Sequence, residues 1–138
     1  MNTGVSFAAL DPDTEERFVS LRRELGVTSF GLNQILLRPG QRGRIHRHRR
    51  QEEAYLVLEG TLTLQFEDST RELGRGELAR VAPDVRRRLW NRTDAPLLVL
   101  AMGGAQPHEG RDGRAYHSWD EQGEGHPPQE VPLPEEAR

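Results

Sequence analysis

Between residues 29 and 102 the chain alternates short apolar segments with clusters of glycine, proline and polar residues. Strands are predicted at residues 30–38, 44–49, 53–58, 61–66, 78–81, 86–90 and 97–102. The turns between them include Pro39-Gly40, Glu59-Gly60, Gly74-Arg75-Gly76 and Pro83-Asp84. Glu59-Gly60 is expected to be a two-residue hairpin turn, because Gly60 can adopt a positive φ. Short strands at this spacing, without long helices between them, indicate an all-β sandwich or barrel.

The residues before these strands carry the signals of a short helix over residues 13–26. Asp13 can cap its first turn and Gly26 can end it. A strand through Phe18–Leu21 is the alternative, and both interpretations stay open. Residues 1–28 are therefore expected to form an N-terminal segment, helical or extended, that packs on the barrel.

The last apolar segment, Leu97–Met102, does not alternate between apolar and polar positions. Both of its faces are therefore expected to be buried, one of them against a second copy of the chain, which predicts a homodimer. The barrel is placed at residues 29–104 and a C-terminal extension at 105–138. Within that extension, residues 111–114 are expected to form a turn held by a salt bridge. Residues 123–138 are rich in proline and glycine and are expected to be extended or disordered.

Composition narrows the classes of function. The 138 residues suit one domain, and the absence of cysteine excludes disulfides, thiol nucleophiles and thiolate metal sites. Every basic residue is arginine, yet the net charge is −3, so neither a nucleic-acid nor a membrane partner is predicted. No apolar run could span a bilayer, and the first residues lack the pattern of a secretory signal. A cytoplasmic location is expected.

Candidate chemistry is concentrated around His46, His48 and Glu53. On a strand, two residues that are two positions apart point to the same side, so both imidazoles face one way. Glu53 follows on the next predicted strand. Two imidazoles and one carboxylate form a facial triad suited to Fe, Mn, Ni or Zn, with coordination positions left for a ligand. Tyr55 shares a face with Glu53 and is a candidate ligand-binding residue, whereas Glu52 would point to the opposite face, near Arg47 or Arg49.

The spacing of these residues resembles that of a known family. Gly40, His46, His48, Glu53 and Gly60 are separated by five, one, four and six residues, as in the first motif of the cupin superfamily. The resemblance covers about residues 29–102. It implies a jelly-roll, or double-stranded β-helix, barrel of six to eight strands that is often dimeric. It also favours Glu53 over Glu52 as the ligand.

The segment from Gly76 to Asn91 resembles the second cupin motif but departs from it twice. Asp84 stands where a glycine is usual, and Arg87 stands where the resemblance places a histidine as fourth metal ligand. Arginine keeps its proton and repels a cation, so Arg87 is predicted to bind an anionic ligand or to pair with Glu53 instead. His108, His117 and His126 lie beyond the barrel strands and are not assigned as replacements.

Two functions stay open. The first is a metal-dependent enzyme of the oxygenase, isomerase or lyase class that acts on a small anionic metabolite through His46, His48 and Glu53. The second is a metal-free, non-catalytic cupin that binds or senses a small ligand, with a Glu53–Arg87 ion pair in place of the metal. The pattern assigns no catalytic residue.

Overall fold

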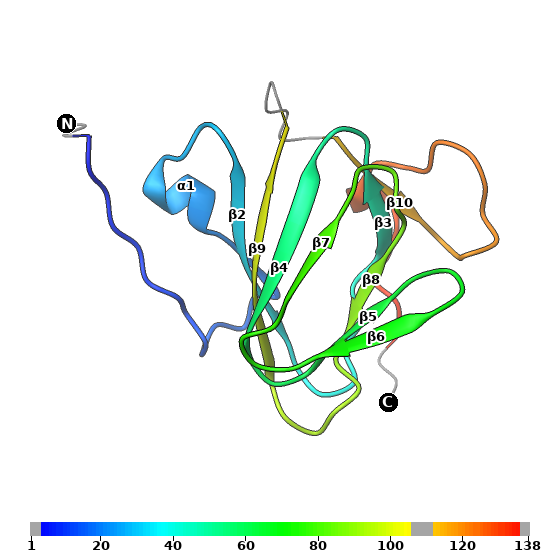
Figure 1. Cartoon of the computed structure of the whole chain (residues 1–138), viewed down its shortest axis with the longest axis horizontal. Helices are drawn as coiled ribbons and strands as arrows, with labels where there is room; N and C mark the ends of the chain where they lie inside the picture. The colour runs from blue at the N-terminus through cyan, green and yellow to red at the C-terminus, as the bar shows by residue number, and fades with distance from the viewer. Residues whose placement is uncertain (1–3, 106–111, 136–138) are drawn as a thin grey trace.

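The computed structural model describes residues 4–105 and 112–135, and strands dominate them (Figure 1). The elements are β1 Phe18–Ser20, α1 Leu21–Leu25, β2 Gly31–Leu37, β3 Ile45–His48, β4 Glu52–Glu59, β5 Leu62–Gln65, β6 Thr70–Leu73, β7 Leu78–Val81, β8 Arg88–Trp90, β9 Leu97–Gly104, β10 Gly113–Tyr116 and a 3₁₀ turn at Pro128–Glu130. None of the helices formed by the described residues is long and apolar enough to cross a bilayer. The all-β prediction is confirmed.

The strands form two antiparallel layers that face each other as a jelly-roll barrel. One layer is a five-stranded sheet in the order β1-β2-β9-β4-β7. The other combines the pair β10-β3 with the sheet β6-β5-β8, and single bridges of Arg42 with Trp90 and of His46 with Arg87 join these two parts. Figure 1 shows β2, β9, β4 and β7 side by side, with β3, β8 and β10 across from them.

Alternating side chains from both layers fill the space between them. The buried apolar cluster comprises Ile35, Leu37, Tyr55, Val57, Leu62, Leu64, Leu73, Val81, Leu89, Leu97, Val99 and Ala101. On β9 the residues Leu97, Val99 and Ala101 point inward, as the two-residue period of a strand requires. Leu98, on the outer face, is also buried, so this part of β9 is covered on both sides. The predicted homodimer stays a prediction.

The N-terminal segment contains both of the structures that the sequence left open. Residues 18–20 pair with β2 as β1, and the helix begins only at Leu21. Ser20, not Asp13, caps this helix, because its hydroxyl accepts a hydrogen bond from the backbone N–H of Arg23. Gly26 ends the helix in the left-handed conformation, as expected.

The expected hairpin at Glu59-Gly60 is absent, because β4 and β5 belong to different layers. Gly60 has φ +84°, and a Cβ there would lie 2.4 Å from the carbonyl oxygen of Pro96. The glycine therefore lies in the connection that crosses from one layer to the other, where the chain passes too close to another backbone for a side chain. Asp84, at the position of the usual cupin glycine, also has a positive φ of 70°. An aspartate tolerates that conformation better than most residues, which explains the first departure from the motif.

The C-terminal part adds a strand that the sequence analysis missed. Residues 113–116 form β10, which pairs with β3 through registers such as Ala115 with His46. The chain then returns along the barrel, where Val131 is buried and its carbonyl oxygen accepts from Arg44 Nε at 2.7 Å. Residues 106–111 and 136–138, which include His108 and part of the expected turn, lie outside the described residues.

Candidate metal centre

The three predicted ligands converge from the two facing layers. His46 and His48 lie on β3, and Glu53 lies on β4. Nε2 of His46 is 3.9 Å from Glu53 Oε1, and Nε2 of His48 is 3.6 Å from Glu53 Oε2. Ligand atoms from all three residues lie within 4.8 Å of one another. The group therefore forms across the barrel interior rather than across a hairpin.

Both imidazoles are held through Nδ1, so that Nε2 points to Glu53. Nδ1 of His46 lies 3.1 Å from the carbonyl oxygen of Arg44, and Nδ1 of His48 lies 2.8 Å from Asp112 Oδ1. Because both partners are acceptors, each Nδ1 carries the proton and donates it. The lone pair is therefore on Nε2 in both rings, which is the form that binds a metal ion.

Glu53 uses its two carboxylate oxygens differently. Oε1 accepts a hydrogen bond from Tyr55 Oη, and another from an Nη of Arg87 at 2.7 Å. Oε2 faces His48. Arg87 is fully buried and also donates to Tyr55 Oη at 3.1 Å and to the carbonyl oxygen of Val85 at 2.9 Å. The predicted Glu53–Arg87 ion pair is therefore present, and it leaves one carboxylate oxygen directed toward the imidazoles.

The protonation states follow from these contacts. Burial lowers the pKa of His46 below the ordinary 6.5, so the ring is neutral at neutral pH. Burial alone would raise the pKa of Glu53, but the interactions with His46 and with the positive charge of Arg87 outweigh it and hold the pKa below its usual value. Burial raises the pKa of the Tyr55 hydroxyl, and the Glu53 charge adds to the effect. The group therefore offers the neutral imidazole of His46 and the carboxylate of Glu53 beside the ring of His48.

A cavity of about 310 Å³ opens beside these residues. Its walls combine apolar side chains with a few polar groups, namely Phe18, Asn33, Ile35, Leu37, Gly43, Arg44, His46, His48, Glu53, Tyr55, Leu89, Ala101, Gly113 and Pro128. Tyr55 therefore lies where the sequence placed it, at the cavity wall. Arg87 is not among the residues that line the cavity, and its guanidinium contacts Glu53 and Tyr55, which do line it. Ligand binding by Arg87 stays a prediction.

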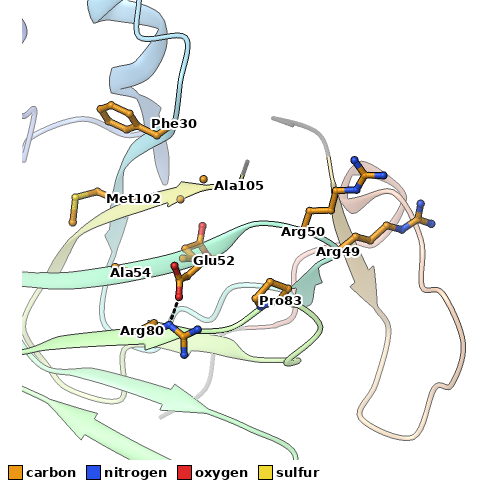
Figure 2. A pocket seen from close by; sticks show the side chains of 12 residues that line it. Phe30, Arg49, Arg50, Glu52, Ala54, Arg80, Pro83, Met102 and Ala105 are labelled. Carbon is orange, nitrogen blue, oxygen red and sulfur yellow. Dashed lines mark hydrogen bonds and ion pairs between the residues drawn. The ribbon is translucent and has the colours of Figure 1, made fainter. Parts of the chain in front are cut away.

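Glu52, the competing acid, points away from this cavity. It pairs with Arg80 of β7 on the outer side of the sheet, in a separate open hollow shown in Figure 2. Arg49 lines the same hollow, as expected, but it pairs with Glu124 rather than with Glu52. Arg47 pairs with Asp84 and Glu124. Neighbouring residues on a strand face opposite ways, which separates Glu52 from Glu53.

Comparison with known proteins decides the family. The sequence profile described as "Cupin domain" matches residues 33–103, slightly more than half of the chain. The chain belongs to the cupin family. No curated protein matches this cupin in sequence.

Solved structures of other cupins have the same fold as this cupin. A cupin-superfamily sugar phosphate isomerase from Silicibacter pomeroyi is 27% identical with a TM-score of 0.63, and the match covers 73% of this chain and 65% of that one. A cupin protein from Bacteroides fragilis is 23% identical with a TM-score of 0.66, over 80% and 92% of the two chains. A cupin conserved-barrel protein from Salinispora arenicola is 22% identical with a TM-score of 0.58, over 69% and 80%. The cupin thus spans about two thirds of the length of the isomerase.

The residues present fit a divalent ion. At a facial or tetrahedral site, two metal–ligand bonds of about 2.1 Å place their donor atoms about 3.0–3.4 Å apart. The two Nε2 atoms lie 3.9 and 3.6 Å from the Glu53 oxygens, so small side-chain movements would bring the three ligands onto one ion. The lone pairs on both Nε2 atoms, together with the free Glu53 oxygen, supply three ligands. Arg87 stands at the position of the usual fourth metal ligand, but its guanidinium points at Oε1 of Glu53 rather than toward the imidazoles. The cupin therefore retains a three-ligand donor set of the facial type.

Two residues of the site were missed by sequence reasoning. Asp112 was expected in a turn, but it is buried and accepts from His48, from the backbone N–H of Arg50 and Gln51, and from the Gln51 amide. The sequence analysis did not single out Arg44, yet it lines the cavity. No local pattern marks Asp112, because the pairing of β10 with β3 brings it there.

Proposed function

We propose that the chain is a metal-dependent enzyme of the isomerase class that acts on a small anionic metabolite. One observation carries the proposal: two imidazole Nε2 atoms and one carboxylate oxygen, all able to bind metal, face each other beside a cavity of about 310 Å³. The isomerase class is favoured among the three predicted classes because a sugar phosphate isomerase of the same superfamily is 27% identical.

Arg44 is the residue that we assign to the anionic group. It is half-buried at the cavity wall, and its Nε donates to the carbonyl oxygen of Val131. Among the described residues its two Nη atoms have no acceptor. A guanidinium fixed at one nitrogen and free at the other two can donate two parallel hydrogen bonds to a phosphate or carboxylate. The sequence analysis gave this role to Arg87, and the position of Arg44 in the cavity wall is what favours Arg44 here.

The other groups of the cavity would position a hydroxyl-rich metabolite. When bound, a divalent ion supplies Lewis acidity toward a hydroxyl or carbonyl oxygen. Asn33 presents an amide at the wall, and the apolar side chains of Ile35, Leu37 and Leu89 exclude water from the interior. Tyr55 and Arg87 hold the Glu53 carboxylate in place. A site with few, fixed polar groups in an apolar wall selects ligands by shape and charge.

The alternative is a metal-free cupin that binds or senses a small ligand. The buried ion pair favours it, because Arg87 satisfies the charge of Glu53 without a metal ion. The two functions differ in the response to chelators. Only the enzyme should lose ligand turnover and thermal stability when metal is removed.

The first experiment compares Glu53→Gln with Glu52→Gln. Both substitutions remove one carboxylate from β4, but only Glu53 faces the imidazoles. We expect freshly purified wild type and Glu52→Gln to retain first-row metal at His46 and His48, and Glu53→Gln and His48→Ala to lose roughly one equivalent. Metal analysis by mass spectrometry measures this. Equal metal content in Glu53→Gln and wild type would refute the metal centre.

The second experiment tests the substrate class. NMR detects the isomerisation of aldose and ketose phosphates through the exchange of a substrate proton with solvent. We expect this exchange with wild type and none with Glu53→Gln. Arg44→Gln should raise KM for phosphorylated sugars more than it lowers kcat, whereas Arg75→Gln, in the exposed turn between β6 and β7, should change neither. Absence of turnover together with phosphate-dependent stabilisation that survives chelators would favour the metal-free function.

A further inference from the structure

A second group of two histidines and one glutamate lies in the C-terminal part, outside the barrel cavity. His117 follows β10, Glu121 follows the turn at residues 119–120, and His126 lies on the returning segment. His126 is paired with Ala115 of β10 by two backbone hydrogen bonds of 2.8 Å. One hairpin-like loop therefore brings three potential metal ligands together.

The three side chains already face one another. Glu121 Oε1 lies 3.2 Å from His117 Nδ1, and Glu121 Oε2 contacts His126 Nε2. The imidazole rings meet edge to face with centroids 4.8 Å apart. One ligand atom from each residue lies within 4.8 Å of the other two. In spacing and ligand type this group matches the one in the barrel.

The loop that carries these residues is braced on several sides. The backbone N–H of His117 donates to Glu121 Oε1 at 2.7 Å, which fixes the carboxylate. Arg86 donates to the carbonyl oxygen of Glu121 at 2.6 Å, and Tyr116 Oη donates to that of Gly123 at 2.8 Å. Gly125 has φ +75°, and a Cβ there would lie 2.9 Å from the Tyr116 ring. Because these contacts do not involve the imidazoles, the loop geometry is set before any ion binds.

We propose that His117, Glu121 and His126 bind one late first-row divalent ion, of which Zn²⁺ is the best fit. Two imidazole nitrogens and one carboxylate oxygen form a borderline donor set that suits zinc, whose fourth position is commonly taken by water. The partly exposed side chains leave room for that water. The proposal is independent of the function proposed for the barrel.

The ion would act as a clamp on the segment that closes the cavity. The loop between His117 and His126 connects β10 with Pro128, and both Gly113 of β10 and Pro128 line the cavity. An ion that joins the two ends of the loop would hold these two wall residues at a fixed separation. Binding to the folded chain alone also stabilises it by linkage.

The test compares Glu121→Gln and His126→Gln with Asp120→Asn. Asp120 is the exposed neighbour of Glu121 and loses the same charge. Metal-free full-length protein is titrated with ZnCl₂ by calorimetry and by mass analysis after gel filtration. We expect Glu121→Gln and His126→Gln each to bind roughly one zinc fewer than wild type, and Asp120→Asn to bind as wild type does. This difference in zinc stoichiometry between wild type and the two loop variants is expected whether or not the barrel also binds zinc.

A second readout separates ligand loss from misfolding. Trp119 lies in the same loop, so Cu²⁺ at the proposed site should quench its fluorescence in wild type and in the barrel variant His46→Ala, but not in His126→Gln. Circular dichroism in chelator verifies that each variant is folded. Unchanged zinc stoichiometry in both ligand variants, or an equal loss in Asp120→Asn, would overturn the proposal. A folded His126→Gln with undiminished Trp119 quenching would also overturn it.

Discussion

The two histidine–glutamate groups differ in their surroundings rather than in their composition. In the barrel, the exposed fractions of His46, His48 and Glu53 are 22%, 16% and 12%. In the C-terminal loop, those of His117, Glu121 and His126 are 52%, 25% and 36%. The barrel carboxylate is supported by Arg87 and Tyr55, whereas the loop carboxylate is supported by a backbone N–H.

The difference shows how burial changes the way in which the charge of the glutamate must be compensated in the folded protein. A buried carboxylate needs a partner cation in the folded state, whether or not metal is present. A partly exposed carboxylate that accepts a backbone hydrogen bond, as Glu121 does, is also solvated by water and needs no buried cation. The barrel group is therefore tied to the stability of the fold and adjoins a ligand-sized cavity, whereas the loop group can lose its charge without cost to the barrel.

The largest expected effect comes from removing the buried cation. Arg87→Met leaves Glu53 without its partner, and we expect the free energy of unfolding in chelator to fall by about 3–5 kcal/mol. Added Zn²⁺ should restore more stability to this variant than to wild type, because a divalent ion supplies the missing charge. Urea unfolding with and without metal measures both effects. Arg80→Met, which breaks the exposed pair with Glu52, is the control and should cost less than about 1 kcal/mol.

The next effect concerns the support of His48. Asp112→Asn weakens the acceptor that fixes the Nδ1 proton, and we expect metal affinity at the barrel to drop about 10–100-fold. Competition with a fluorescent chelator measures it. Asp84→Asn is the control. It removes an exposed partner of Arg47 and keeps a residue that tolerates positive φ, so the metal affinity of this variant should equal that of wild type. Equal affinities in all three proteins would contradict the role given to Asp112.

A smaller effect is expected from pH. The folded-state pKa of His46 lies below 6.5, so the unfolded chain takes up a proton that the folded chain refuses as the pH falls below 6.5. Stability should therefore decrease with falling pH, by at most about 1.4 kcal/mol per pH unit for this one group. The lowered pKa of Glu53 extends the loss below pH 4.5. Urea unfolding in chelator at stepped pH checks this, and His46→Gln should have a flatter profile between pH 6.5 and 5.

The smallest expected effect is on the melting temperature when the loop glutamate, rather than the barrel glutamate, is changed. In chelator, Glu121→Gln should lower the melting temperature only slightly, because its hydrogen bonds lie in a partly exposed loop and it has no buried cation to strand. In zinc, wild type should melt higher than this variant. A large destabilisation of Glu121→Gln in chelator would mean that the loop group has a structural role of its own.

Much of the barrel was accessible to sequence reasoning. The strand at 78–81 and the inward face of β4 follow from two-residue periods that depend only on local chain geometry. The strand at 97–102 follows instead from a short continuous apolar run. The shared direction of His46 and His48 follows from the same period. The N-terminal cap was misplaced because Asp13 and Ser20 both suit that role, and only the pairing of residues 18–20 with β2 decides between them.

The sequence by itself determined the family, most of the barrel strands and the three residues that meet at the candidate metal centre, because alternation and fixed spacing are properties of neighbouring residues. Tertiary structure alone decided which distant groups meet them. Asp112 reaches His48 across 64 positions, Arg87 reaches Glu53 across 34, and Gly60 serves a crossover rather than a hairpin. Contacts of this kind depend on how strands pair between layers, and no local pattern encodes that pairing.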